Sequence, residues 1–110
     1  MVEDVQAMIA YITCSSEDEA LRIGRALVEE RLAACVNLIP GMRSLYRWQG
    51  AIEEAREVVL LAKTTSRCAE ALTARVMALH SYACPCVVLL PISGGNDAYL
   101  AWLRENVGNA

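Results

Sequence analysis

The sequence predicts an α+β fold in which one antiparallel β-sheet carries helices on one face. Three observations lead to this prediction. Short apolar runs rich in β-branched residues alternate with amphipathic stretches at helical spacing, the two central runs are joined by a two-residue turn, and a further helical stretch follows the last run. The 110 residues are expected to form a single domain, residues 1–110.

The first strand and the first helix are expected near the N-terminus. Residues 5–13 are largely apolar and end in β-branched side chains, which is typical of a central strand. Ser15 or Ser16 can cap the following helix, whose first turn carries three acidic residues at the positive end of the helix dipole. Apolar residues recur at helical spacing as far as Leu32, which predicts about four to five turns.

The central part of the chain predicts a long β-hairpin. Residues 34–39 form its first arm, and Pro40-Gly41 favours a turn or bulge after which pairing resumes over residues 44–48. Gln49-Gly50 supplies the reversal, and residues 51–63 return as a long strand. A hairpin of this length extends beyond a compact domain, so its tip should lie on another surface.

A second helix and a last strand complete the sheet. Ser66 is the expected cap of the helix, His80 stands at its end, and residues 87–92 read as a strand. The apolar face of the helix consists of Ala69, Leu72, Val76 and Leu79. The order is therefore β-α-β-β-α-β with an additional C-terminal helix, which is the ferredoxin-like arrangement.

Composition indicates an oligomer. Apolar residues make up 55% of the chain, above the usual range of about 45–50%. A monomer of this size has too little interior for them, so part of the apolar surface should face other subunits.

Charge and cysteine content exclude several classes of partner. The net charge of −3 and the scattered cations argue against nucleic acid. No apolar run is long enough for a membrane span, and the N-terminus lacks the cationic segment of a secretory signal. Five cysteines, an odd number, indicate free thiols in a reducing cytoplasm.

No set of residues in the sequence forms a catalytic motif. The chain has one histidine and lacks a phosphate-binding glycine loop, a His-Glu-x-x-His motif and a Gly-x-Ser-x-Gly motif. We therefore expect a protein that is not an enzyme. A thiol-dependent enzyme, in which one cysteine meets His80, is the least supported alternative.

Cysteines make a metal site the better hypothesis. Cys14 lies where the first strand meets the first helix, and a helix N-terminus favours the thiolate that binds soft ions. Cys84 and Cys86 are two residues apart, so in a strand they would share a face and chelate Cu(I), provided that Pro85 does not turn them apart. The structural alternatives are that cysteines fill the core and that His80 caps its helix.

Several motifs together resemble the CutA family of trimeric divalent-cation tolerance proteins. They are Leu-Ala-Ala-Cys-Val-Asn at 32–37, Tyr46-x-Trp48-x-Gly50, Lys63-Thr64, Tyr82-x-x-Pro85, and Tyr99-Leu100-x-Trp102. The resemblance implies a copper-binding homotrimer with Cys14 and His80 as metal ligands. This chain lacks the second histidine and the acid that other members carry nearby, and Cys86 is a candidate substitute.

The expectation is therefore a cytoplasmic copper-response homotrimer. Its main rival is a regulatory or scaffold trimer similar to the nitrogen-regulatory PII proteins, which bind small ligands in clefts between subunits. Such a cleft is expected to involve Lys63, Arg47, Glu53, Glu57 and Tyr82.

Overall fold

A computed structural model describes residues 5–108 and contains a four-stranded sheet with three helices. The strands are β1 (Ala7–Cys14), β2 (Cys35–Trp48), β3 (Ala51–Thr65) and β4 (Val87–Pro91). The helices are α1 (Glu17–Glu29), α2 (Ala69–Leu79) and α3 (Asp97–Glu105). The sheet order is β2-β3-β1-β4 with antiparallel pairing throughout, so the predicted ferredoxin-like fold is confirmed.

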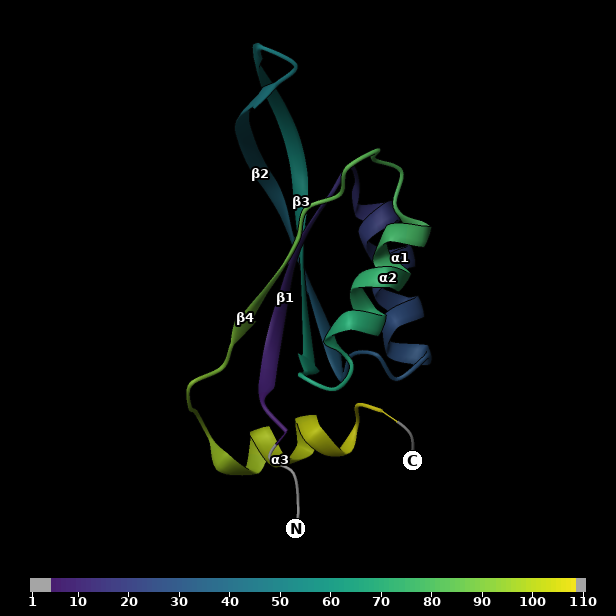
Figure 1. The fold of residues 1–110 in the computed structure, drawn as a ribbon, viewed down its shortest axis with the longest axis vertical. Coiled ribbons are helices and arrows are strands. Elements are labelled where there is room, and N and C mark those ends of the chain that lie inside the picture. The colour runs from purple at the N-terminus through teal and green to yellow at the C-terminus, as the bar shows by residue number, and fades with distance from the viewer. Residues whose placement is uncertain (1–4, 109–110) are drawn as a thin grey trace.

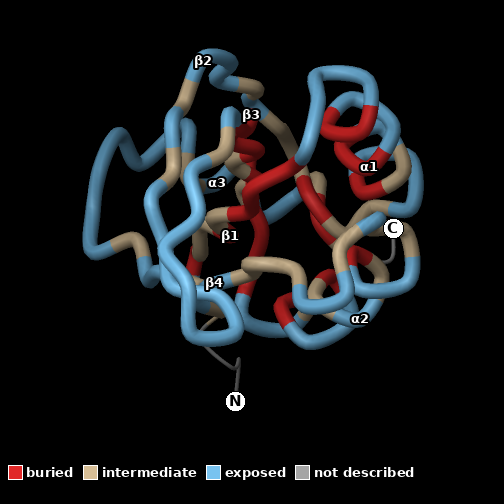
Figure 2. Tube along the Cα trace, turned by 90° about the horizontal axis from the view of Figure 1, so that it is seen from above, coloured by how far each residue is buried: buried red, intermediate tan, exposed pale blue. Residues whose placement is uncertain are grey.

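Helices α1 and α2 cover one face of the sheet, and α3 crosses its lower end (Figure 1). Buried residues line the space between the sheet and the two helices (Figure 2). The largest of them are Ile12, Ile23, Leu60 and Leu72. The opposite face of the sheet carries no helix, and Val88 and Leu90 of β4 remain half exposed there.

Helix α1 ends earlier than the sequence predicts, after 13 residues. Arg31 adopts the left-handed conformation, with φ 60°. The Leu32 and Arg31 amides then donate to the carbonyls of Leu27 and Val28, which is the Schellman pattern of helix termination. The apolar periodicity extends to Leu32 because that side chain still packs on the core after the chain has turned.

Helix α2 begins at a later residue than the sequence predicts. Cys68, rather than Ser66, is its cap residue, and no side chain caps the helix there. The Ser66 hydroxyl instead accepts a hydrogen bond from the Gln6 amide. Among the described residues, no helix is long and apolar enough to cross a membrane.

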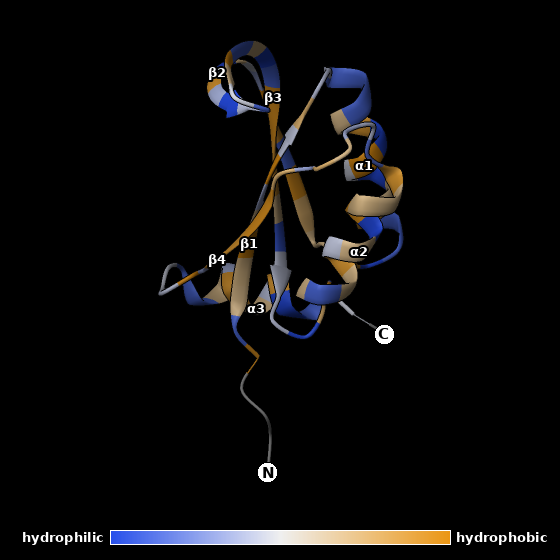
Figure 3. Cartoon of the chain, turned by 45° about the horizontal axis from the view of Figure 1, so that its top comes forward, coloured by the Kyte–Doolittle hydropathy of each residue, from blue (hydrophilic) through white to orange (hydrophobic). Residues whose placement is uncertain are grey.

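The β2–β3 hairpin projects well beyond the helices (Figure 1), and the molecule measures 51 × 25 × 23 Å. Gln49 and Gly50 both have positive φ, as a tight two-residue reversal requires. Polar and apolar residues alternate closely at the tip (Figure 3), and Leu45 and Ile52 are 73% and 70% exposed. The predicted overshoot of the hairpin is therefore confirmed.

A β-bulge in β2 decides which side chains share a face. Leu38 pairs with Leu60, but beyond the irregularity between Ile39 and Met42, Met42 pairs with Glu57. The extra residue shifts the alternation by one position. Tyr46 and Trp48 consequently lie on the open face of the sheet, away from α1 and α2.

Candidate metal cluster and adjoining pocket

Three potential metal ligands converge where β1, α1 and α2 end or begin. One ligand atom from each of Cys14, Glu19 and His80 lies within 4.8 Å of the other two. Cys14 is the last residue of β1, Glu19 is in the first turn of α1, and His80 follows the last residue of α2. The sequence analysis paired Cys14 with His80, and the structure brings these two together.

Glu19 is held in place by the start of its own helix. Its backbone amide donates to the Ser16 hydroxyl at 3.1 Å, and its carboxylate accepts from the Ser15 amide and hydroxyl, each at 2.9 Å. The Ser81 amide donates to the other carboxylate oxygen at 2.9 Å. Burial alone would raise the pKa of Glu19, but these hydrogen bonds outweigh it and lower the pKa to about 2.

The His80 imidazole is fully buried and bonded on both nitrogens. Its Nε2 lies 2.7 Å from the Thr13 carbonyl, and its Nδ1 lies 3.1 Å from the Tyr82 amide nitrogen. A carbonyl only accepts and an amide N–H only donates, so the neutral ring carries its proton on Nε2. Nδ1, which is 3.9 Å from a Glu19 oxygen, therefore carries the ring's lone pair, and this lone pair accepts the Tyr82 amide N–H.

Cys14 corrects the expectation of a polarised thiol. Its side chain is completely buried. Burial is the main cause that raises the pKa of Cys14 to about 12, and the Glu19 and Glu57 carboxylates raise it further. The position before a helix was read correctly, but the low-polarity surroundings and the neighbouring negative charges outweigh the helix N-terminus.

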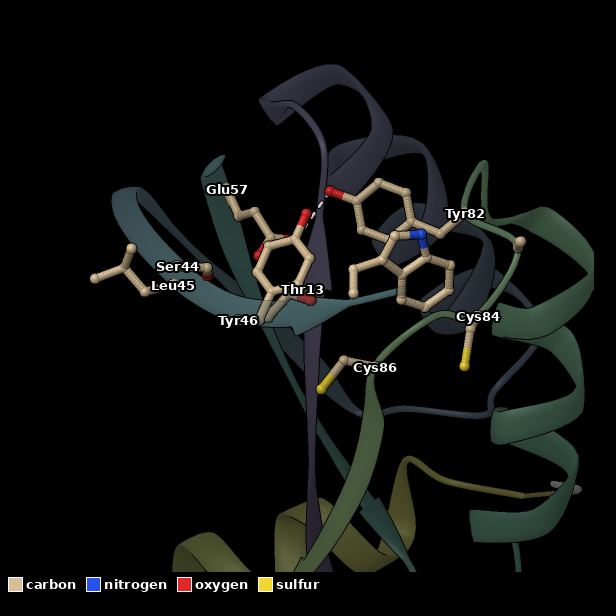
Figure 4. A pocket seen from close by; sticks show the side chains of 10 residues that line it. Thr13, Ser44, Leu45, Tyr46, Glu57, Tyr82, Cys84 and Cys86 are labelled. Atoms are coloured by element: carbon tan, nitrogen blue, oxygen red, sulfur yellow. Dashed lines mark hydrogen bonds between the residues drawn. The ribbon is translucent and has the colours of Figure 1, made fainter. Parts of the chain in front are cut away.

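Cys86 lies outside this cluster, and the strand argument for a Cys84–Cys86 chelate is wrong. β4 begins only at Val87, so these two cysteines occupy the preceding loop and do not follow strand alternation. Figure 4 shows the two side chains at separate places along this loop. Both line a pocket next to the cluster.

That pocket, here called the hairpin pocket, has a volume of about 470 Å³. It lies between the hairpin arm and the 81–86 loop (Figure 4). Its lining includes Tyr46, Trp48, Glu57, Tyr82, Cys84 and Cys86.

Tyr82 joins the hairpin pocket to the metal cluster. Its hydroxyl donates to a Glu57 oxygen at 2.8 Å, and its ring centre lies 4.6 Å from that of His80. Burial, followed by this hydrogen bond, raises the pKa of Tyr82 well above its usual value, so the phenol keeps its proton.

Lys63, which the sequence analysis placed in a cleft between subunits, lies away from the hairpin pocket within the chain. It is not among the residues that line the hairpin pocket; its Nζ lies 3.2 Å from the Tyr99 hydroxyl and 5.3 Å from the centre of that ring. Sequence analysis grouped it with Glu57 and Tyr82, but β3 carries it to the other end of the sheet. Sequence reasoning also missed Glu19 as a cluster member, although a serine followed three residues later by a glutamate is a capping signal that fixes a carboxylate at this point.

Comparison with known proteins identifies the family. The model of the CutA1 divalent ion tolerance protein family matches residues 8–106. A Thermus thermophilus divalent-cation tolerance protein CutA is 55% identical over 100 residues, which cover 91% of this chain and 97% of that protein. Human protein CutA is 49% identical over 96 residues, which cover 87% of this chain and 54% of that protein, so the chain spans about half of the human relative.

Solved structures agree with this result. The divalent cation tolerance protein of Thermus thermophilus superposes with a TM-score of 0.91 at 54% identity, covering 93% of this chain and 99% of that one. CutA from Xylella fastidiosa also gives 0.91, at 40% identity, with coverage of 94% and 99%. The matched region includes every described strand and helix in whole or in large part, and the chain belongs to the CutA1 divalent ion tolerance family.

Proposed function

We propose that this protein is a copper-binding homotrimer that acts in the response to divalent cations, without catalysing a reaction. The observation that carries the proposal is the convergence of Cys14, Glu19 and His80 within 4.8 Å. A thiolate and an imidazole suit copper, and the carboxylate supplies negative charge.

The residues present fit a metal ion. The Nε2–H of His80 is bonded to the Thr13 carbonyl, the kind of contact that orients a ligating imidazole and leaves Nδ1 available. Binding would require that Nδ1 release the Tyr82 amide and that Cys14 lose its proton. Glu19 and His80 are also held in place by hydrogen bonds to Ser15, Ser81, Thr13 and Tyr82.

The exposed apolar surface supports assembly into a trimer. Tyr46, Trp48, Val88 and Leu90 are 44%, 45%, 50% and 51% exposed, and all four lie on or beside the open face of the sheet. Large exposed apolar and aromatic side chains such as these are typical of subunit interfaces. The free edges of β2 and β4 would also be covered by pairing with other copies.

Copper titration of the reduced protein tests the metal site. Cys14→Ser and His80→Ala should each weaken Cu(I) binding at least about tenfold. Cys86→Ser, which changes a thiol outside the cluster, and Cys35→Ser, a control in β2, should leave the affinity nearly unchanged. If the Cys86 substitution weakens binding and the first two do not, the site is in the 81–86 loop; if none of the four has an effect, the copper proposal fails.

The pH dependence offers a second test of the same site. Because burial raises the pKa of Cys14 to about 12, the thiol is protonated throughout the neutral range and must release a proton when metal binds. The affinity should therefore rise about tenfold for each pH unit between pH 6.5 and pH 8.5. A flat profile would show that Cys14 is not a ligand.

The second candidate function is a regulatory or scaffold trimer similar to PII proteins, binding a small ligand at clefts between subunits. The hairpin pocket favours it, because its volume is in the range of small-molecule sites and its walls include three aromatic side chains. A reduced protein that binds no copper but binds a small molecule at this pocket would make this candidate the leading one.

We propose a cytoplasmic location because the cysteines do not form disulfides. The five cysteines are all free and include the exposed Cys84, as expected in a reducing cytoplasm. Relatives carry other labels, since the Arabidopsis thaliana protein is named chloroplastic and the Archaeoglobus fulgidus structure is described as periplasmic. Fractionation with an antibody would decide the location for this chain.

A further inference from the structure

Glu57 is a buried carboxylate that lines the hairpin pocket and forms no ion pair with any residue that the structure describes. Its residue is 8% exposed, and its recorded hydrogen bond comes from the Tyr82 hydroxyl. No lysine or arginine within residues 5–108 forms an ion pair with it. A charged group with so little access to water is costly unless it is paired or well hydrogen-bonded.

Glu57 lies in the interior of β3, just beyond the point where the neighbouring strand β1 ends. Glu57 adjoins Val58, which pairs with Cys14, the last residue of β1, so β1 does not extend beside it. On the other side, Glu57 pairs with Met42 immediately after the bulge in β2. The carboxylate therefore stands at a gap in the sheet that the 81–86 loop covers only in part.

Aromatic rings surround the same space. Tyr46 and Trp48 line it from β2 because the bulge turns them onto the open face. Tyr82 approaches from the loop, on the other side of the space from Tyr46 (Figure 4). Faces of aromatic rings attract weakly hydrated cations. The combination of three rings and one unpaired carboxylate has complementary charge and shape for an organic cation.

We propose that the hairpin pocket binds a small organic cation, an alkylated ammonium group held between Tyr46, Trp48 and Tyr82 and neutralised by Glu57. The proposal rests on the second candidate function and names the class of its ligand. A hard metal ion is a poor fit because it needs several oxygen ligands, and Glu57 supplies the one carboxyl group among the lining residues. The volume of about 470 Å³ accommodates a molecule of the size of choline.

Choline and its neutral isostere dimethylbutanol provide the test. The two molecules have nearly the same shape and differ in charge, so their difference isolates recognition of the cation. Binding to the intact reduced protein is measured by calorimetry and by the fluorescence of Trp48 in a Trp102→Phe background. Choline should bind at least about tenfold more tightly than dimethylbutanol.

Two variants that each remove one negative charge test whether Glu57 causes the preference for choline. Glu57→Gln keeps an acceptor for the Tyr82 hydroxyl but removes the charge, so it should abolish the preference for choline. Glu70→Gln makes the same change on an exposed residue at the start of α2 and should preserve it. Circular dichroism confirms that both variants are folded.

Other outcomes overturn the proposal. Equal binding of the two probes, or a preference that survives in Glu57→Gln, excludes cation recognition. If neither probe binds while Glu57→Gln weakens subunit association, a second copy of the chain occupies the pocket. Copper affinity is measured on the wild-type protein beside the two organic probes, so failure of the copper proposal is distinguishable from failure of cation recognition in the hairpin pocket.

Discussion

Replacing Glu19 by glutamine tests how much the ionised carboxylate of the cluster contributes to the stability of the fold. The change preserves the shape of the side chain but removes its charge, and it sets an amide NH₂ against one of the backbone amides that now donate to the carboxylate. Glu19 is 7% exposed, so water cannot replace the lost interactions. Its three donors come from Ser15 and Ser81.

The size of the effect follows from the pKa. Glu19 has a pKa of about 2 in the folded protein, against an ordinary value of 4.5. At about 1.4 kcal/mol for each tenfold change, ionised Glu19 contributes on the order of 3 kcal/mol to the free energy of unfolding. Because folding lowers the pKa, this contribution is fully present above about pH 4.5 and is lost as the pH falls towards about 2.

Urea unfolding from pH 7 to pH 2.5, at fixed protomer concentration, measures the difference. Glu19→Gln should be less stable than the wild type by about 3 kcal/mol at pH 7, and the gap should shrink to about 1 kcal/mol at pH 2.5. Glu29→Gln on the same helix, where the carboxylate is 66% exposed, should change stability by less than about 0.5 kcal/mol. A gap for Glu19→Gln that stays constant with pH, or that is below about 1 kcal/mol at pH 7, would refute the reasoning.

Three further predictions concern thiol access, packing and assembly. In native protein treated with an alkylating reagent, mass spectrometry should find exposed Cys84 modified early and buried Cys14 last; early modification of Cys14 would contradict its burial and raised pKa. Gly24→Ala should lower the free energy of unfolding by about 1–2 kcal/mol in urea, although alanine favours helices, because the new Cβ would lie 2.9 Å from Val36 Cγ2; equal or greater stability would show that the core yields. Trp48→Glu should shift sedimentation equilibrium from trimer towards monomer, and an unchanged trimer would remove the hairpin from the proposed interface.

The sequence alone predicts the order of the elements and the reversals between them. Ser16 begins α1 as a helix cap should, and Gln49-Gly50 closes the hairpin, because capping and turn formation depend on residues close together in the chain. The predicted end of α1 was too late, because no local signal marks the residue at which the helix stops. Leu32 satisfies helical periodicity, but a left-handed Arg31 has no strong signal in its residue type.

The chemical state of the site was decided by contacts between distant residues. Cys14 has a favourable local position for a thiolate, yet the fold buries it and places Glu19 and Glu57 nearby, which keeps the thiol protonated. Glu19 accepts from Ser81, 62 positions away, and His80 bonds Thr13, 67 positions away. Burial and long-range hydrogen bonds set pKa values and ligand geometry, and neither can be read from local patterns. The sequence thus determined which residues stand at the ends of the elements, whereas the tertiary structure decided which of them meet and in what protonation state.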